Sequence, residues 1–318
     1  MKLSGTDPYL PQKSHKLLAL VVLFQNLRIN EIDGLPDERN ISDEDGNSLK
    51  VGVLDGRLVP PFGESNYRKL PDIPIRDDDV VLIGYPKAGC QWTWQILSMI
   101  VAGKSCYSEL GKVISFLEFA SREMIDELPS RRILNTHLWL DYVPRQVTEK
   151  KTKIVFTVRN PKDTAVSFYN HYKSLINLYG YKGPFNKWFP LYMEGQVDYG
   201  SYFDYHQEWD RAIDNNPDLP ILIVSYEDMK EDLPREIRKL SEFVGATLSD
   251  QQVESIAQAA RFDTMKQALN ARVSHKLLRK GEVGDWKNWL TVAQSEMVDA
   301  AVEQKLKGTR FVFPRYTI

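Results

Sequence analysis

Short apolar segments alternate along the chain with longer segments of mixed polarity. Four of them have the nearly continuous apolar core of a buried strand, namely Val80–Gly84, Arg132–Asn135, Lys153–Arg159 and Ile221–Tyr226. Amphipathic segments that predict helices are Trp92–Ala102, Asp163–Leu178, Tyr202–Asn215, Leu233–Val244 and Asp250–Ala260. In the last of these, Val253, Ala257 and Ala260 recur with the spacing of one helical face.

The alternation of strands and helices predicts an α/β fold with a central parallel sheet. Strands that are apolar throughout are typical of parallel sheets, because helices cover both faces. Such sheets bind their ligands outside the carboxyl ends of the strands. Gly84, Asn135 and Arg159 stand at the ends of three predicted strands. We therefore expect the segments that follow them to form one site.

The acidic segment Glu31–Asp45 contains seven carboxylates and one basic residue, Arg39. Such a composition is typical of a solvated loop. The interpretation is an N-terminal extension at residues 1–50, partly an acidic linker, followed by one domain at residues 51–318. No internal repeat and no low-complexity tract is visible in the sequence.

Composition restricts the class of protein. The 318 residues are 42% apolar and 26% charged with a net charge of −2, which does not suggest a nucleic-acid partner. Two cysteines favour a reducing, cytoplasmic location over a disulfide framework. The early apolar run Leu17–Phe24 has eight residues, and about 20 are needed to span a bilayer. No small-residue cleavage pattern follows it, so we expect a packed helix and no membrane segment.

The segment Tyr85-Pro-Lys-Ala-Gly-Cys-Gln-Trp92 directly follows the first strand. A strand that runs through a glycine-containing turn into a helix directs backbone N–H groups at an anion, and Lys87 adds a charge. Alternatively, this is an ordinary turn with an exposed lysine. A kinase-type loop is disfavoured, because Lys87 precedes Gly89 and no hydroxyl residue follows to hold magnesium.

Two further segments carry features of phosphate binding. Arg159 ends a strand and offers a planar fork suited to phosphate, and Ser167 lies on the helix that follows. Near the C-terminus, Arg279-Lys-Gly281 precedes Gly284-Asp-Trp286, and glycines there permit close backbone approach. Each motif alone is compatible with a structural role. Together they predict a ligand with phosphates at two places.

In this order the three segments resemble the cytosolic sulfotransferase family, and the likeness runs from Val51 to Val312. The resemblance implies the P-loop-like nucleotide-binding fold of sulfotransferases and the donor 3′-phosphoadenosine 5′-phosphosulfate (PAPS), with 3′-phosphoadenosine 5′-phosphate (PAP) as its product. It implies no metal. The donor-binding residues that it implies are Lys87, Ala88, Gly89, Cys90, Gln91, Trp92, Arg159, Ser167, Tyr226, Phe262, Arg279, Lys280 and Gly281.

The resemblance also implies catalytic roles. His137 is the general base, Lys87 stabilises the leaving phosphate oxygen, and Ser167 restrains Lys87. The family commonly has a lysine two residues before the histidine, to contact the sulfuryl oxygens, where this chain has Asn135. It usually has Ser-Gly-Thr-Thr after the loop lysine, where this chain has Ala88-Gly-Cys-Gln91. These departures predict a slow or specialised enzyme.

The resemblance also implies a class of acceptor and an oligomeric state. Phe116, Phe119 and His171 match positions that line the acceptor site, which implies a hydroxyl on a small, fairly apolar molecule. A phenol, a sterol-like alcohol and a phenolic amine all fit. The family's short dimer motif is matched by Lys287, Thr291, Val292 and Glu296, which suggests a weak homodimer.

Two other functions stay open from the sequence. Asn135 and the altered loop are compatible with a protein that binds the donor without catalysis. Sulfation followed by loss of the sulfate would make the protein a dehydratase. A separate hypothesis concerns Cys90, because a thiol at a helix N-terminus near Lys87 can have a lowered pKa and high reactivity.

Overall fold

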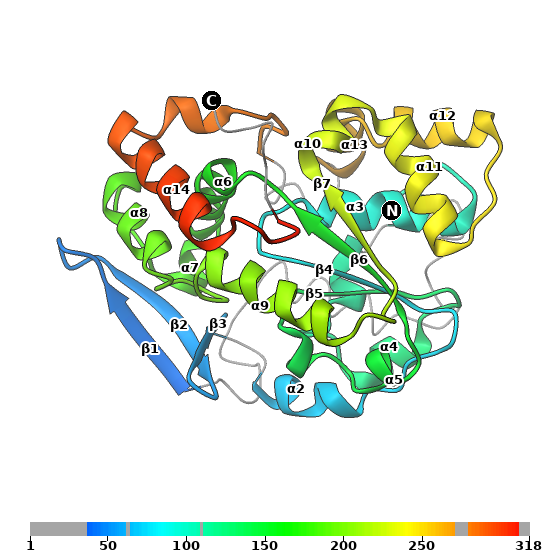
Figure 1. Ribbon diagram of the computed structural model, residues 1–318, viewed down its shortest axis with the longest axis horizontal. Helices are drawn as coiled ribbons and strands as arrows, with labels where there is room; N and C mark the ends of the chain where they lie inside the picture. Colours follow the sequence, from blue (N-terminus) through cyan, green and yellow to red (C-terminus); the bar gives the residue numbers. More distant parts are fainter. Residues whose placement is uncertain (1–36, 62–63, 109–110, 271–278, 312–318) are drawn as a thin grey trace.

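The computed structural model describes residues 37–61, 64–108, 111–270 and 279–311, so the segment Leu17–Phe24 lies outside the described residues. Its centre is a sheet of four parallel strands in the order β5-β4-β6-β7 (Figure 1). The strands are β4 (Val80–Gly84), β5 (Ile133–Thr136), β6 (Lys153–Val158) and β7 (Ile221–Ser225). The predicted α/β fold with a central parallel sheet is confirmed.

Register brings the carboxyl ends of these strands together. Leu82 of β4 lies opposite Asn135 of β5 and Val155 of β6. All five residues of β4 are buried, as expected for a central strand covered on both faces. Gly84, Asn135 and Arg159 therefore lie along one edge of the sheet, where the sequence placed them.

Helices cover both faces of the sheet. In Figure 1, α3 (Cys90–Ala102), α11 (Leu233–Val244) and α12 (Asp250–Ala259) lie to its right, and α6 (Pro161–Ser174), α9 (Tyr202–Asn215) and α14 (Val292–Lys305) to its left. The remaining helices are α2 (Glu64–Lys69), α4 (Arg122–Glu127), α5 (Gln146–Glu149), α7 (Ile176–Tyr179), α8 (Phe185–Met193), α10 (Tyr226–Glu231) and α13 (Phe262–Asn270). Short 3-10 helices are η2 (Leu70–Asp72), η3 (Gly111–Ser115), η4 (Leu140–Tyr142) and η6 (Asp285–Asn288). None of the helices in the described part of the chain has the length and apolarity to cross a membrane.

The predicted helix Asp163–Leu178 differs from the structure at both ends. It begins earlier, because the Asn160 side chain caps the helix by accepting from the Lys162 N–H and Pro161 occupies the first turn. It breaks at Leu175, where α6 ends and α7 begins. The predicted helices Tyr202–Asn215 and Leu233–Val244 agree with α9 and α11 residue for residue.

The expected boundary at residue 50 is wrong, because it falls inside a strand. Strands β1 (Asp37–Ser42), β2 (Ser48–Leu54) and β3 (Arg57–Val59) form a small antiparallel sheet. Ile41 and Leu49 are buried, and the Tyr181 hydroxyl donates to Asp43 at 2.7 Å. Residues 37–50 therefore belong to the folded body. Among the acidic side chains in the described part of this segment, Asp37, Glu38, Glu44 and Asp45 are exposed on the hairpin or its turn.

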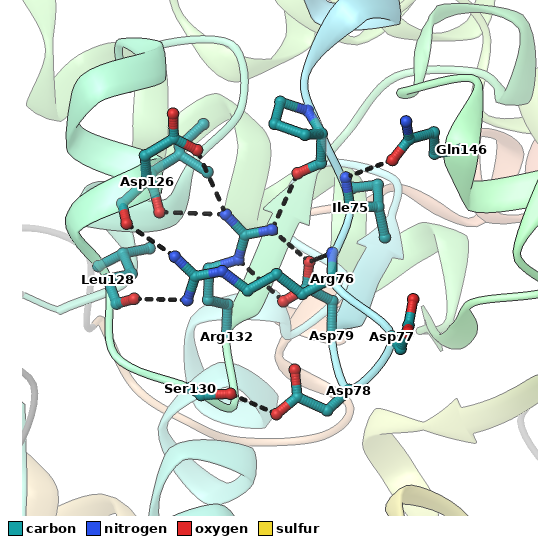
Figure 2. A network of polar contacts seen from close by, with 12 residues as sticks. Ile75, Arg76, Asp77, Asp78, Asp79, Asp126, Leu128, Ser130, Arg132 and Gln146 are labelled. Carbon is teal, nitrogen blue, oxygen red and sulfur yellow. Dashed lines mark hydrogen bonds and ion pairs between the residues drawn. The ribbon is translucent and has the colours of Figure 1, made fainter.

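A polar network fixes the opposite, amino-terminal edge of the parallel sheet (Figure 2). Arg132 directly precedes β5 and Asp79 directly precedes β4, and their side chains are 1% and 0% exposed. Arg132 Nε donates to Asp79 Oδ1 at 2.8 Å, and the Arg132 carbonyl accepts from the Val80 N–H at 3.0 Å. This ion pair fixes the start of two neighbouring strands, far from the ends that carry the candidate site.

Candidate active site

The loop after β4 is shaped for an anion. Lys87 and Gly89 adopt positive φ of 70° and 110°, which turns the chain sharply into α3. A Cβ on Gly89 would lie 3.0 Å from the Tyr226 ring, so glycine is required there. The first N–H groups of α3 have no acceptor within the helix and carry its positive dipole end. Burial, together with the charges of Lys112 and Arg159, lowers the pKa of Lys87 to about 8.

Arg159 joins this loop to the C-terminal segment. Its guanidinium donates to the Lys87 carbonyl at 3.4 Å and to the Glu282 carbonyl at 3.0 Å. It lies over the Tyr226 ring, 4.2 Å from the ring centre. Its buried Nε has no hydrogen-bond partner among the described residues. The guanidinium therefore keeps a donor for a ligand between the two phosphate-binding segments.

The C-terminal segment is held on α6 by a carboxylate. Asp163 accepts from the Gly284 N–H at 2.7 Å and from the Trp286 N–H at 3.0 Å. Arg279 and Lys280 each pair with Asp285 at 2.6 Å. Burial alone would raise the pKa of Asp285, but hydrogen bonds from Lys280 and Arg279 outweigh it and lower the pKa to about 2. Asp285 thus holds both cations in the segment whose Glu282 carbonyl accepts from Arg159.

Aromatic residues gather on the same side. The rings of Trp92 and Tyr226 meet edge to face at 5.2 Å, and Trp92 Nε1 donates to the Ala260 carbonyl at 2.7 Å. Phe262 lies against Gly281, where an added Cβ would lie 2.2 Å from the ring. The structure therefore brings Trp92, Tyr226 and Phe262, which the resemblance assigns to the donor, close to the candidate phosphate-binding segments.

The residues present fit an anionic nucleotide. Besides Arg159 Nε, the buried Gln91 Nε2 lacks a partner among the described residues, so this amide can replace a missing loop hydroxyl. Ala88 is fully buried and contributes only backbone. Metal binding was not expected, and no group of three or more His, Cys, Asp or Glu residues in the described segments could hold a metal.

The hypothesis of a reactive Cys90 is wrong. The residue is buried, and its Sγ lies 3.0 Å from Thr157 Oγ1 inside the sheet-helix junction. Burial raises the pKa of the thiol, and this outweighs the opposing effect of Lys112. Cys90 offers a ligand only its backbone N–H.

His137 follows β5 and faces the phosphate loop. Its Nδ1 lies 2.7 Å from the Gly84 carbonyl, which can only accept, so Nδ1 carries the proton and Nε2 the lone pair. Its backbone N–H donates to Glu118 at 2.6 Å. Burial, followed by the charge of Lys112, lowers the pKa of the imidazole well below its usual range. The imidazole is therefore neutral at pH 7, as a base must be.

Three residues beside His137 were not found from the sequence. Lys112 Nζ lies 3.2 Å from His137 Nε2, and Tyr199 packs its ring 5.5 Å from the imidazole. Glu118 accepts from His137 and from the Tyr199 hydroxyl, and burial raises its pKa to about 7. No periodicity marks these positions. Only their closeness in sequence to Phe116 and Phe119 connects Lys112 and Glu118 to the predicted site.

The resemblance assigns Phe116, Phe119 and His171 to the acceptor site, and the structure places the Phe116 ring against the candidate base His137. Phe116 lies edge to face with His137 at 5.5 Å. The buried His171 Nδ1 lacks a partner among the described residues, and burial followed by the charge of Lys87 lowers the pKa of this imidazole. Phe119 is half-buried on the same segment as Phe116.

Ser167 is half-buried on α6, and no hydrogen bond among the described residues joins it to Lys87, so its restraining role stays a prediction.

Comparison with known proteins agrees with this geometry. The family model described as the sulfotransferase domain matches residues 77–310. Sulfotransferase 6B1 of Danio rerio is 37% identical over 279 residues, which cover 85% of this chain and 92% of the relative. Sulfotransferase 1A1 of Mus musculus is 34% identical over 80% of this chain and 94% of the relative.

Solved structures give the same result. The mouse sulfotransferase SULT7A1, complexed with PAP, superposes with a TM-score of 0.69 at 28% identity, covering 82% of this chain and 96% of that one. Retinol dehydratase, in a complex with retinol and PAP, superposes with a TM-score of 0.68 over 96% of this chain and 98% of that one, and its 18% identity supports the fold alone. The chain belongs to the sulfotransferase family and is a sulfotransferase.

Proposed function

We propose that the protein transfers the sulfuryl group of PAPS to the hydroxyl of a small, fairly apolar acceptor, with His137 as general base. The observation that carries this proposal is the lone pair of His137 Nε2, oriented by the Gly84 carbonyl and facing two lysines. PAPS supplies the activated sulfuryl group, and the adjacent phosphate departs with PAP. Phenols, sterol-like alcohols and phenolic amines remain the candidate acceptors.

The donor would be held by the segments described above. The N–H groups that open α3 and Lys87 suit the 5′-phosphate, while Arg159, Ser167, Arg279, Lys280 and the Gly281 backbone suit the 3′-phosphate. Trp92 and Phe262 offer faces for the adenine, with Tyr226 at its edge. The mouse sulfotransferase at 28% identity was solved with PAP, which supports the same ligand here.

His137 would take the proton of the acceptor hydroxyl at Nε2. Lys87 would neutralise the oxygen of the departing phosphate, and Ser167 would limit its access to the donor until an acceptor is present. Phe116, Phe119 and His171 would exclude water around the acceptor. With two free cysteines and no disulfide between them, we propose a cytoplasmic location.

The test is a mass-spectrometric screen. Incubation of the protein with PAPS and a panel of phenols, sterols and phenolic amines is expected to yield products heavier by one sulfonate. A product lighter than its substrate would favour the sulfation-coupled dehydratase. PAP binding without any product would favour a donor-binding protein, and a protein that binds neither PAP nor PAPS would contradict the proposal.

We also propose a weak homodimer through Lys287, Thr291, Val292 and Glu296. Thr291 caps α14 in a capping box, and the adjacent Val292 is 75% exposed, an unusual position for a large apolar side chain. A small patch of this kind supports association at micromolar rather than nanomolar concentrations.

Val292→Glu is expected to produce a monomer, because a charge at the centre of a small apolar contact cannot be desolvated without cost. Light scattering after size-exclusion chromatography, over a range of concentrations, measures the change. Met297→Glu, five residues further along α14 and on another side of the helix, changes a side chain that is 51% exposed and is the matched control that should still dimerise. A wild-type protein that stays monomeric at high concentration would remove the proposal.

A further inference from the structure

Lys112 lies where the reaction needs a positive charge. It belongs to η3, and its ammonium donates to His137 Nε2 and to Asn135 Oδ1, both at 3.2 Å. The same nitrogen lies 4.4 Å from the centre of the Phe116 ring. Since Nε2 is the atom that would accept the acceptor proton, a group beside it is also beside the transferring sulfur.

No carboxylate of the described residues contacts the Lys112 ammonium directly. In the described part of the chain, no carboxylate forms an ion pair with its ammonium, and the groups in direct contact are an amide, a neutral imidazole and an aromatic ring. Burial lowers the pKa of Lys112 and outweighs the opposing effects of the nearby Cys90 and Glu118. A largely buried cation without an anion in contact is costly, so a bound anion is the natural partner.

The charge of Lys112 also acts on Lys87. The charge of Lys112 is, after burial, the largest influence that lowers the pKa of Lys87. Two cations that repel each other across a site are both stabilised when an anion enters between them. A donor whose 5′-phosphate lies at Lys87 would place the negative oxygens of its sulfuryl group between Lys87 and Lys112.

The Asn135 side chain forms two hydrogen bonds with Lys112. Its Oδ1 accepts from the ammonium at 3.2 Å, and its Nδ2 donates to the Lys112 backbone carbonyl at 2.9 Å. Nδ2 also donates to Ser115 Oγ at 3.0 Å, which fixes the amide. Asn135 is almost fully buried, so the amide itself contributes direction rather than charge.

We propose that Lys112 supplies the charge that stabilises the sulfuryl oxygens during transfer, and that Asn135 is a positioning residue that holds Lys112 there. This deepens the proposed function and rests on it.

As the acceptor hydroxyl binds at His137 Nε2, the ammonium turns from Nε2 to the sulfuryl oxygens. The acceptor oxygen then bonds to sulfur, the bond from sulfur to the 5′-phosphate oxygen breaks with its electron pair on that oxygen, and the acceptor proton passes to Nε2. Lys112 keeps its proton throughout. The charge that Asn135 lacks is thus delivered from an earlier segment of the chain.

The experiment compares Lys112→Met, Asn135→Lys and the double variant with the wild type. Lys112→Met is expected to lower kcat about 10²-fold, the range for loss of one donor to a developing anion. Calorimetric titration should show weaker binding of PAPS, by about tenfold, and unchanged binding of PAP, which has no sulfuryl group. In the double variant, a lysine at position 135 should restore most of the lost kcat and PAPS affinity. The exposed Lys104, replaced by Met, is the control and should match the wild type.

Two readouts separate this role from a structural one. Without its charge beside Nε2, the pKa of His137 in the donor-free protein should rise, which NMR titration of the imidazole measures. The thermal midpoint of Lys112→Met should stay level or rise, because an unneutralised cation has been removed. Lys112→Gln provides the same test if the Met variant does not fold.

The role of Lys112 would be overturned by wild-type kcat and PAPS affinity in the folded Lys112→Met variant, or by equal losses of PAP and PAPS binding. Failure of the double variant to recover would overturn the link to position 135. A wild-type protein that binds neither nucleotide would instead contradict the proposed function itself.

Discussion

Replacement of His137 by Asn is expected to lower kcat about 10³-fold, within the range for loss of a general base. The Asn amide can still donate toward the Gly84 carbonyl, as His137 Nδ1 does at 2.7 Å, so the local backbone should keep its shape. It has no lone pair of comparable basicity where Nε2 stood. The acceptor hydroxyl would then have to attack while still holding its proton.

The measurement is steady-state turnover with the acceptor that gives the highest rate in the mass-spectrometric screen, together with PAP affinity. PAP affinity should stay within about twofold of the wild type, because the proposed role places His137 against the acceptor and not against the phosphates. A kcat within tenfold of the wild type would contradict the assignment of His137 as the base.

The pH dependence of the wild type follows from the same imidazole. Burial and the charge of Lys112 hold the pKa of His137 well below the ordinary value, and the Gly84 carbonyl only partly opposes them. The neutral form of His137 should therefore persist below pH 6.5, and its protonation at lower pH is expected to abolish activity. The acid limb of kcat/KM should lie below about pH 6.5, the ordinary histidine value, and should move upward in Lys112→Met.

Replacement of Arg132 by Met is expected to reduce the free energy of unfolding by about 3–5 kcal/mol, the cost of leaving a buried charge unpaired. Arg132 donates to both oxygens of Asp79, to the Pro74 carbonyl at 2.9 Å and to the Ile125 carbonyl at 3.2 Å (Figure 2). All these acceptors lose a donor together. The Asp79 carboxylate would keep only the Arg76 N–H, at 2.7 Å, among the partners described here.

Urea denaturation measures the loss, and Arg145→Met is the control. Arg145 also pairs with an aspartate, Asp72, but the two side chains are 67% and 66% exposed, so its removal should cost less than about 1 kcal/mol. Asp79→Asn combined with Arg132→Met should cost less than the sum of the two single changes, because the pair acts as a unit. A loss below about 1 kcal/mol for Arg132→Met would show that the network is not a main stabilising contact. The kcat of the folded fraction should be unchanged, since the network lies at the opposite edge of the sheet.

Local patterns predicted most of the parallel sheet and several helices. An apolar run such as Val80–Gly84 has few alternatives to a buried strand, and amphipathic helices such as Leu233–Val244 have a clear face. The strand β1 was missed because five of its six side chains are exposed, so that its composition resembles a solvated loop. The contact of Asp43 with Tyr181 joins residues more than a hundred positions apart in the sequence.

The sequence by itself determined the family, the candidate phosphate-binding segments and the position of His137, because these depend on residue type and local spacing. Tertiary structure decided the rest of the chemistry. It buried Cys90 and so raised the pKa of its thiol, and it brought Lys112 to within 3.2 Å of His137. The pKa of the Cys90 thiol depends on burial. The contact between Lys112 and His137, which are 25 residues apart in the sequence, depends on how η3 packs against the end of β5. No periodicity in the sequence encodes this contact. In the sequence alone, Asn135 is a loss of the family's positive charge, whereas the structure places the Lys112 ammonium beside it.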